Sequence, residues 1–249
     1  MADEIPLVLL HGYPFDHALW EQVVSRLPKD VPIVAPDLPG FGQEPAPAAE
    51  PSLDILADHV EQLLQRRNIQ KAIVAGFSMG GYVALAMLDK YPARIARLAL
   101  INSQPFADSD EVRAGRRTMI ERVRREGAEA AAKAALLKLF APGKANDPKF
   151  SGYAQRGAEA AGVAGITWAL EAMARRPDRT ALLQKFEAPL LILHSDQDQF
   201  IPVERVRAFA HKHPTAIYVE VPGSGHCTPL EKPDAVADAL EQLLSRTQP

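Results

Sequence analysis

Short, continuously apolar runs alternate along the chain with longer segments in which apolar residues recur every three or four positions. A continuous apolar run is typical of a strand that is buried on both faces of a parallel sheet. The pattern predicts strands at Ile5–Leu10, at Val31–Ala35, in the run through Ile73 and Val74 that ends at Gly76, and at Ile95–Ile101, Leu190–His194 and Ala216–Val221.

Helix-type periodicity fills the intervals between these strands. Ser52 is expected to cap an amphipathic helix whose apolar face is formed by Leu53, Leu56, Val60, Leu63 and Leu64. Further helices are predicted at Leu19–Leu27, at Tyr82–Lys90 and at about Pro233–Arg246. Alternating strands and helices predict an α/β fold with a doubly wound parallel sheet and right-handed crossovers.

The pattern changes in the middle of the chain. Residues 108–183 contain no convincing strand and are rich in Ala, Arg and Glu, with helical runs at Glu111–Glu126, Ala128–Phe140 and Ala158–Arg175. We interpret residues 105–186 as a helical cap or lid over the strand ends; an enlarged crossover between two strands is the alternative. The core is then expected in two parts, residues 1–104 and 187–249.

One turn in this pattern carries a chemical signal. The strand that ends at Gly76 runs directly into Gly76-Phe77-Ser78-Met79-Gly80, the G-x-S-x-G pattern of a nucleophile elbow, and a helix follows. A Ser on so sharp a turn is held in a strained conformation with its Oγ presented outward, and the neighbouring Gly residues let strand and helix approach. The alternative is a tight turn without chemistry.

Other reactive groups follow the ends of other strands. Tyr13 follows His11-Gly12, Asp196 and Asp198 follow the strand at 190–194, and His226 lies in a Gly-rich loop after the last strand. Loops at the carboxyl ends of parallel strands converge on one ligand site. A Ser hydroxyl needs a base, and the base needs an orienting carboxylate. The expected catalytic residues are therefore Ser78, His226 and an aspartate, with the backbone N–H groups of Tyr13 and Met79 as the oxyanion hole.

The choice between the two aspartates stays open at this point. We favour Asp198 as the catalytic acid, with Asp196 organising the turn. The side chain of His11 is expected to bond loop backbone, and Asp37 is expected to bond backbone N–H groups in its Pro/Gly-rich turn.

Composition excludes several classes of protein. The 249 residues carry a formal net charge of −3, which gives no electrostatic case for nucleic acid or an anionic membrane. No apolar stretch approaches the length of a membrane span. The single cysteine, Cys227, excludes an internal disulfide framework, and with the absence of a signal peptide it favours the cytoplasm. A thiol nucleophile at Cys227 is a minor alternative.

Two further kinds of site are not favoured. The Gly40-Phe41-Gly42 turn lacks the third Gly or the Gly-Lys-Ser/Thr of a phosphate loop. His211 and His213 have no matching acid cluster for a metal and are expected to be solvated. We expect no metal and no cofactor.

Several segments together resemble the α/β-hydrolase superfamily, specifically its small esterase, lactonase and perhydrolase branch. They are His11-Gly12, Asp37 to Gly42, Gly76 to Gly81, Asp198 to Pro202 and Gly225-His226-Cys227-Thr228-Pro229-Leu230-Glu231. The resemblance covers nearly the whole chain. It implies the α/β-hydrolase fold, with a mostly parallel sheet, helices on both faces and a helical lid, and it supports Asp198 as the acid. A Ser in the elbow points away from dehalogenases and epoxide hydrolases, whose nucleophile is a carboxylate.

The predicted function is hydrolysis of carboxylic esters through an acyl-enzyme. The segment Arg113 to Arg125 and the lid pattern look similar to enol-lactonases, so lactonase action is an alternative, as is perhydrolysis with the same triad. A ligand receptor without turnover is a further alternative. Phe77, Trp168 and Phe140 are the expected contacts for a small ester or lactone substrate. The oligomeric state is left open.

Overall fold

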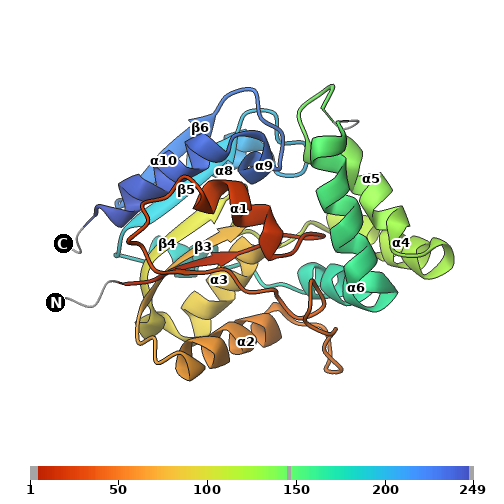
Figure 1. Cartoon of the computed structure of the whole chain (residues 1–249), viewed down its shortest axis with the longest axis horizontal. Coiled ribbons are helices and arrows are strands. Elements are labelled where there is room, and N and C mark those ends of the chain that lie inside the picture. Colours follow the sequence, from red (N-terminus) through yellow and green to blue (C-terminus); the bar gives the residue numbers. More distant parts are fainter. Residues whose placement is uncertain (1–4, 145–146, 247–249) are drawn as a thin grey trace.

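A six-stranded parallel sheet forms the centre of the computed structural model, which describes residues 5–144 and 147–246 (Figure 1). The strand order is β2-β1-β3-β4-β5-β6, and every neighbouring pair is parallel. The strands are β1 (Leu7–Leu10), β2 (Ile33–Val34), β3 (Ala72–Phe77), β4 (Ile95–Ile101), β5 (Leu190–Ser195) and β6 (Ala216–Val221). The predicted α/β fold with a parallel sheet is confirmed.

The side chains of successive strand residues point to opposite faces of the sheet. Leu7 and Leu9 of β1 share an apolar core with helices α1 (Glu21–Val24) and α10 (Pro233–Leu244). Val8 and Leu10 share another with α2 (Leu53–Arg66), α3 (Met79–Lys90) and α8 (Val203–Ala210). Each fully buried Leu of this kind contributes about 1.5–3 kcal/mol. Burial on both faces explains why the strands read as unbroken apolar runs.

Three helices gather beside the sheet as a separate block, seen at the right of Figure 1: α4 (Asp110–Glu126), α5 (Glu129–Leu139) and α6 (Pro148–Ala174). Helix α6 packs on the loops that follow β1 and β2. A Cβ on Gly157 would lie 2.0 Å from the carbonyl oxygen of Pro14, and one on Gly165 would lie 2.1 Å from that of Gly40. Helix α6 therefore lies against the loops at the carboxyl ends of β1 and β2.

The largest difference from the predicted elements concerns α6. The pattern placed a helix at Ala158–Arg175, whereas α6 begins at Pro148, capped by the side chain of Asp147. Glycines interrupt the apolar spacing, and Gly162 itself has non-helical angles (φ 59°, ψ −173°) that kink the helix. A cap residue followed by Pro is a helix-start signal that marked the true beginning.

Other boundaries also differ. The helix predicted at Leu19–Leu27 is a 3₁₀ turn at His17–Trp20, capped by Asp16, followed by the short α1. The short helices α7 (Thr180–Gln184) and α9 (Thr228–Glu231) and the 3₁₀ turn η2 (Pro92–Arg94) were not predicted. Among the residues that the structure describes, no helix combines the length and the apolar character that crossing a membrane requires.

Candidate active site

Ser78 occupies the turn between β3 and α3 in a strained conformation, with φ 50° and ψ −113°. The turn can be this sharp because the glycines on either side of Ser78 have no side chain, which lets backbone atoms of neighbouring segments come very close. A Cβ on Gly76 would lie 2.3 Å from the carbonyl carbon of Gly80, and a Cβ on Gly80 would lie 2.1 Å from the carbonyl oxygen of Leu10. Both glycines of the G-x-S-x-G pattern are therefore required by close packing, as the sequence pattern predicted.

Replacing Gly76 with Ala is expected to destabilise the fold by about 1–3 kcal/mol, the usual cost of overpacking, because backbone and not a flexible side chain meets the new methyl group. Gly115→Ala is the matched control, since Gly115 lies inside α4 with no atom within 4 Å of the added Cβ. There the same substitution is expected to stabilise by about 0.5–1 kcal/mol. Urea unfolding measures both, and equal effects would contradict the steric explanation.

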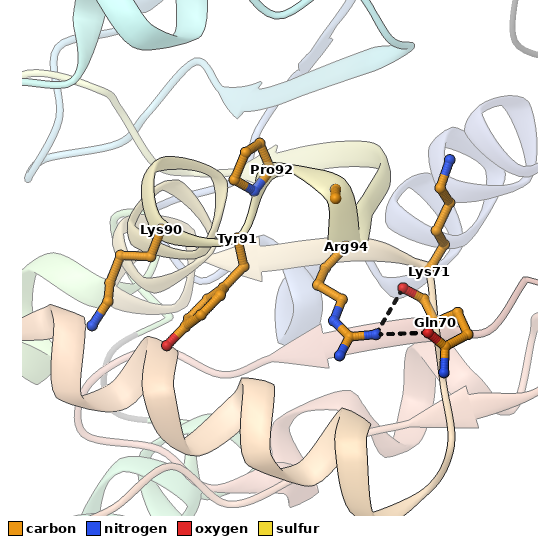
Figure 2. Close-up of a pocket in the computed structure, with 7 residues that line it drawn as sticks. Gln70, Lys71, Lys90, Tyr91, Pro92 and Arg94 are labelled. Atoms are coloured by element: carbon orange, nitrogen blue, oxygen red, sulfur yellow. Dashed lines mark hydrogen bonds between the residues drawn. The ribbon is translucent and has the colours of Figure 1, made fainter.

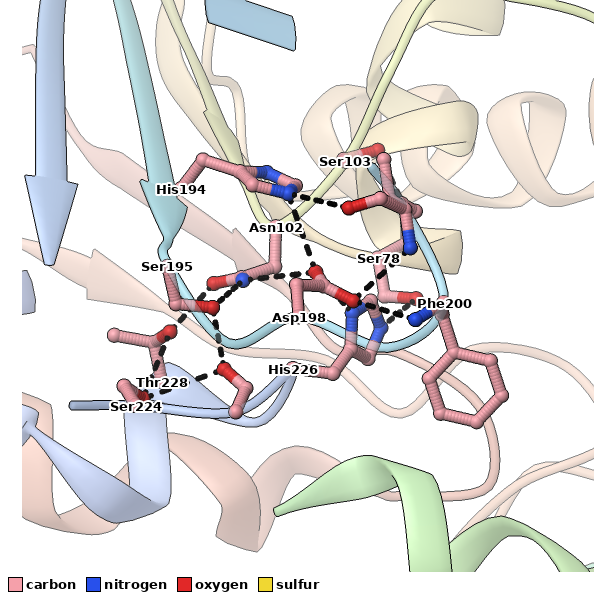
Figure 3. A network of polar contacts seen from close by, with 12 residues as sticks. Ser78, Asn102, Ser103, His194, Ser195, Asp198, Phe200, Ser224, His226 and Thr228 are labelled. Carbon is pink, nitrogen blue, oxygen red and sulfur yellow. Dashed lines mark hydrogen bonds and ion pairs between the residues drawn. The ribbon is translucent and has the colours of Figure 1, made fainter. Parts of the chain in front are cut away.

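His226 and Asp198 complete a hydrogen-bonded line with Ser78 (Figure 3). The Oγ of Ser78 lies 2.8 Å from Nε2 of His226, and Nδ1 of His226 lies 2.7 Å from Oδ2 of Asp198. An ionised carboxylate only accepts hydrogen bonds, so the Nδ1–H of His226 donates to Asp198 and Nε2 is left to accept the proton of Ser78. The arrangement can abstract that proton.

Asp198 is held ionised by its surroundings. Its Oδ1 accepts the backbone N–H groups of Phe200 and Ile201 at 2.8 and 3.0 Å, and its Oδ2 accepts Nδ2–H of Asn102 at 3.1 Å. Burial raises the pKa of Asp198, but His226 and the hydrogen bond from Asn102 outweigh burial and lower the pKa to about 2. Asp196 instead accepts the N–H of Gly223 at 2.8 Å, which places it in the turn.

Asn102, which the sequence reasoning missed, joins three of the loops. It follows β4 with φ 43°, is fully buried, and donates to the Oγ of Ser195 at 2.7 Å as well as to Asp198. Its Oδ1 accepts the hydroxyl of Thr228 at 2.6 Å. Figure 3 shows this network to the left of Asp198, on the side away from Ser78. A polar residue directly after a predicted strand was the available signal.

His194, also missed, lies fully buried at the end of β5. Its Nε2 is 3.0 Å from the carbonyl oxygen of Ile201 and 3.3 Å from Oδ2 of Asp198. Because a carbonyl oxygen only accepts, Nε2 carries the proton. Burial lowers the pKa of His194, so the ring is neutral and its N–H adds to the donors around the Asp198 carboxylate.

The backbone of the His226 loop is tied to the cap. The buried carboxylate of Glu231 accepts the N–H of Gly225 at 2.8 Å through Oε1 and the N–H of Ala141 at 3.1 Å through Oε2. The N–H of Cys227 donates to the carbonyl oxygen of Leu139, at the end of α5, at 2.7 Å. Residues on both sides of His226 are thus anchored to the segment between α5 and α6.

The loop after β1 lies against the elbow, as an oxyanion hole requires. A Cβ on Gly12 would lie 2.7 Å from the ring of Phe77. Within residues 5–144 and 147–246, the backbone N–H groups of Tyr13 and Met79 have no hydrogen-bond acceptor. The N–H of Met79 also opens α3, where the positive end of the helix dipole favours a developing oxyanion.

The three aromatic residues expected to contact substrate are all buried. Phe77 lies against the ring of His226, with 5.2 Å between centroids. Phe140 stacks on Phe150, and Nε1 of Trp168 donates to the carbonyl oxygen of Ala49, so both have a packing role. Phe200, which was not predicted, is 44% exposed and lies 5.0 Å from the His226 ring. It is an exposed apolar side chain beside the reacting groups.

The remaining candidate residues have other partners. His11 is buried and accepts the N–H of Leu38 at 2.9 Å, and burial lowers its pKa to about 4. Cys227 is fully buried, and burial raises the pKa of its thiol, which disfavours a thiolate nucleophile. His213 is buried, not solvated as predicted, with Nε2 against the carbonyl oxygen of Leu183. Among the described residues, no group of three or more potential ligands could hold a metal ion.

A surface pocket of about 510 Å³ lies away from these groups, at the start of β3 and the end of α3, whereas Ser78 lies at the end of β3 and the start of α3 (Figure 2). Two of its basic residues, Arg94 and Lys90, have partners nearby. Arg94 forms an ion pair with Glu61 at 2.8 Å and donates to the carbonyl oxygens of Ile69 and Gln70, and Lys90 pairs with Asp58. Because it contains none of the Ser78, Asp198 and His226 side chains, we do not assign the reaction to it.

A family model for the alpha/beta hydrolase fold matches residues 5–233. The chain belongs to the alpha/beta hydrolase family. Among solved structures, a thermophilic esterase from Thermogutta terrifontis in its malate-bound form is 32% identical, with a TM-score of 0.89, and the match covers 96% of this chain and 88% of that chain. The enol-lactonase from Burkholderia xenovorans LB400 is 25% identical, with a TM-score of 0.88, over 97% and 92% of the two chains.

Curated alpha/beta hydrolase relatives extend the comparison. The 2-succinyl-6-hydroxy-2,4-cyclohexadiene-1-carboxylate synthase of Enterobacter sp. (strain 638) is 27% identical over 96% of this chain and 91% of its own length. The abhydrolase domain-containing protein abhd-5.2 of Caenorhabditis elegans is 35% identical, but the match spans 42% of this chain and 24% of that protein. These similarities establish the superfamily and its small esterase and lactonase branch, which the sequence motifs predicted.

Proposed function

We propose that this protein hydrolyses carboxylic esters with Ser78 as nucleophile, His226 as base and Asp198 as the orienting acid. One observation carries the proposal: a Ser hydroxyl on a strained elbow, 2.8 Å from an imidazole that is itself 2.7 Å from a buried carboxylate. The 32% identical esterase supports the ester as substrate class.

In the proposed reaction, Oγ of Ser78 attacks the ester carbonyl carbon while its proton passes to Nε2 of His226. The carbonyl oxygen becomes an oxyanion that the N–H groups of Tyr13 and Met79 stabilise. The C–O bond then breaks, His226 returns the proton to the leaving alcohol, and the acyl group remains on Ser78. Water, activated by His226, releases the acid and restores the hydroxyl.

Lactones are the second candidate substrate class, and the similarity to an enol-lactonase favours them. Ring opening uses the same groups, with the leaving alcohol still tethered to the acyl chain. Perhydrolysis would use the same triad with hydrogen peroxide in place of water, and only the pocket distinguishes these reactions. We also propose a cytoplasmic location, because the single cysteine, Cys227, leaves no internal disulfide framework.

A panel of p-nitrophenyl esters of increasing acyl length, assayed beside several lactones, tests the proposal. We expect a burst of p-nitrophenol followed by a sustained steady state, because the acyl-enzyme forms and turns over. Sustained lactone opening with little ester turnover would select the second candidate. Absence of both would favour a ligand receptor that keeps the fold without turnover.

The pH dependence of kcat/KM should report the imidazole and not the carboxyl. Because the pKa of Asp198 is lowered to about 2, this carboxylate stays ionised throughout the assay range. Only a neutral imidazole accepts a proton. We therefore expect kcat/KM to fall on acidification while Asp198 is still ionised. Circular dichroism over the same range is the control for unfolding, and a flat profile would contradict His226 as base.

A further inference from the structure

The loop after β4 supplies none of the three side chains of the proposed triad, yet it holds the backbone of the nucleophile. The N–H of Ser78 donates to the carbonyl oxygen of Ile101 at 3.0 Å. The hydroxyl of Ser103 donates to the carbonyl oxygen of Ser78 at 2.8 Å. Because the residues on both sides of position 102 bind the elbow, the side chain at position 102 has a fixed place relative to the nucleophile.

Asn102, which lies between these two residues, reaches both the acid and the histidine loop (Figure 3). Its Nδ2 donates to Oδ2 of Asp198 at 3.1 Å and to Oγ of Ser195 at 2.7 Å, and its Oδ1 accepts the hydroxyl of Thr228 at 2.6 Å. The backbone N–H of Thr228 in turn donates to the carbonyl oxygen of His226 at 3.0 Å. One side chain thus connects the loop of the acid with the loop of the histidine.

The partners of Asn102 fix which way its amide points. The hydroxyl of Ser195 donates its hydrogen to the carbonyl oxygen of Gly225, so the oxygen of Ser195 is left to accept. The ionised carboxylate of Asp198 also only accepts. The NH₂ group of Asn102 therefore faces these two acceptors, and its oxygen faces the hydroxyl of Thr228. Neither a carboxylate nor an apolar side chain at this position could make all three bonds.

The bond from Asn102 reaches the carboxylate oxygen that serves the histidine. Two backbone N–H groups hold Oδ1 of Asp198, but rotation about the Cβ–Cγ bond still moves Oδ2, and this torsion is broad for Asp side chains. Oδ2 is the atom that lies 2.7 Å from Nδ1 of His226. Nε2 of His194 lies farther from Oδ2 than Asn102 does, at 3.3 Å, and is shared with the carbonyl oxygen of Ile201. Asn102 is therefore the closer of the two other side chains that fix Oδ2.

We propose that Asn102 is a positioning residue for ester hydrolysis: it holds Oδ2 of Asp198 in line with Nδ1 of His226 and keeps both loops in place relative to the elbow. This inference rests on the proposed esterase function. Asn102 contacts no reacting atom, so its effect on the rate passes through Asp198 and His226. Its loss should therefore lower kcat and leave the binding of substrate nearly unchanged.

The test removes the side chain with Asn102→Gly, because glycine adopts the positive φ of 43° found here without strain. Release of p-nitrophenol is divided by the amount of Ser78 that a fluorophosphonate labels, so that misfolded molecules are not counted. We expect kcat per labelled site to fall about 10- to 100-fold, as for a lost hydrogen bond to a charged group, with KM nearly unchanged.

Asn68→Gly is the matched control for the backbone. It makes the same change at another left-handed position, with φ 56°, where Asn68 is exposed after the end of α2. It should leave kcat per labelled site unchanged.

A double substitution separates positioning from a general structural defect. In Asp198→Asn no carboxylate remains to be positioned, so adding Asn102→Gly should lower kcat further by less than about threefold. The activity of Ser78→Ala is subtracted as background. A structural defect would instead multiply with the loss caused by Asp198→Asn.

Should Asn102→Gly fail to fold, Thr228→Val decides, because it removes the hydroxyl that Asn102 accepts and nearly keeps the size of the side chain. We expect kcat per labelled site to fall about 3- to 10-fold, as for an ordinary hydrogen bond, and the loss to disappear in the Asp198→Asn background.

An unchanged kcat per labelled site in the variant that folds, or full multiplication of its loss with that of Asp198→Asn, would overturn the positioning role and leave the esterase intact. Absence of turnover that depends on Ser78 in the unsubstituted protein would instead overturn the esterase function itself. The two failures are therefore distinguishable.

Discussion

Ser78→Ala is expected to lower kcat for ester hydrolysis by about 10⁵- to 10⁶-fold, the loss seen when a serine protease loses its nucleophile. Among the side chains that the structure describes, only His226 forms a hydrogen bond with the hydroxyl, so its removal takes away the attacking atom and one hydrogen bond. The measurement is steady-state release of p-nitrophenol, with the burst amplitude as a second readout that should vanish.

The fold of Ser78→Ala should stay intact, because the positive φ of residue 78 is set by the glycine packing around it and Ala meets no new atoms there. An unchanged thermal midpoint is the control. Retention of more than about one per cent of the activity would exceed what the oxyanion hole and binding alone supply, and would show that another group attacks the ester.

Asp198→Asn is expected to lower kcat by about 10⁴-fold, as the same change does in a serine protease triad. The N–H groups of Phe200 and Ile201 would hold the single amide oxygen of the new side chain. Its NH₂ group would then face Nδ1 of His226, which favours the tautomer with the proton on Nε2. In that tautomer His226 donates toward Ser78 and cannot accept its proton.

Asp196→Asn is the matched control for the acid. Asp196 accepts one backbone N–H, from Gly223, and an amide oxygen can accept the same bond. We expect kcat to change by less than about threefold. If Asp196→Asn were the more damaging of the two substitutions, the roles of the two aspartates would have to be exchanged.

The parts of this molecule that could be predicted are those with local causes. The strands read as apolar runs because Leu7 to Leu10 are covered on both faces, and the elbow could be identified because backbone contacts at Gly76 and Gly80 exclude any other residue type. The convergence of Ser78, His226 and Asp198 followed from a single rule about strand ends in parallel sheets.

The parts that could not be predicted depend on partners far away in the chain. Asn102 acquires its place from Ser195, Asp198 and Thr228, and Glu231 from Ala141. The residues adjacent to Asn102 and Glu231 in the sequence do not indicate which distant residues these side chains will contact. Similarly, Gly157 stands where α6 approaches Pro14 so closely that a Cβ would lie 2.0 Å from its carbonyl oxygen, so a distant contact and not helix propensity requires glycine there.

The anchoring of the His226 loop to the cap limits how this protein can be recombined. Leu139 holds the N–H of Cys227, and Ala141 holds the Glu231 carboxylate that binds the N–H of Gly225, so residues 139–141 position the loop that carries His226. A chimera that receives foreign helices to change its substrate range should therefore keep residues 139–141 of this protein, with the junction after Ala141. A junction before Leu139 would replace the residues that anchor the His226 loop as well as those that form the pocket.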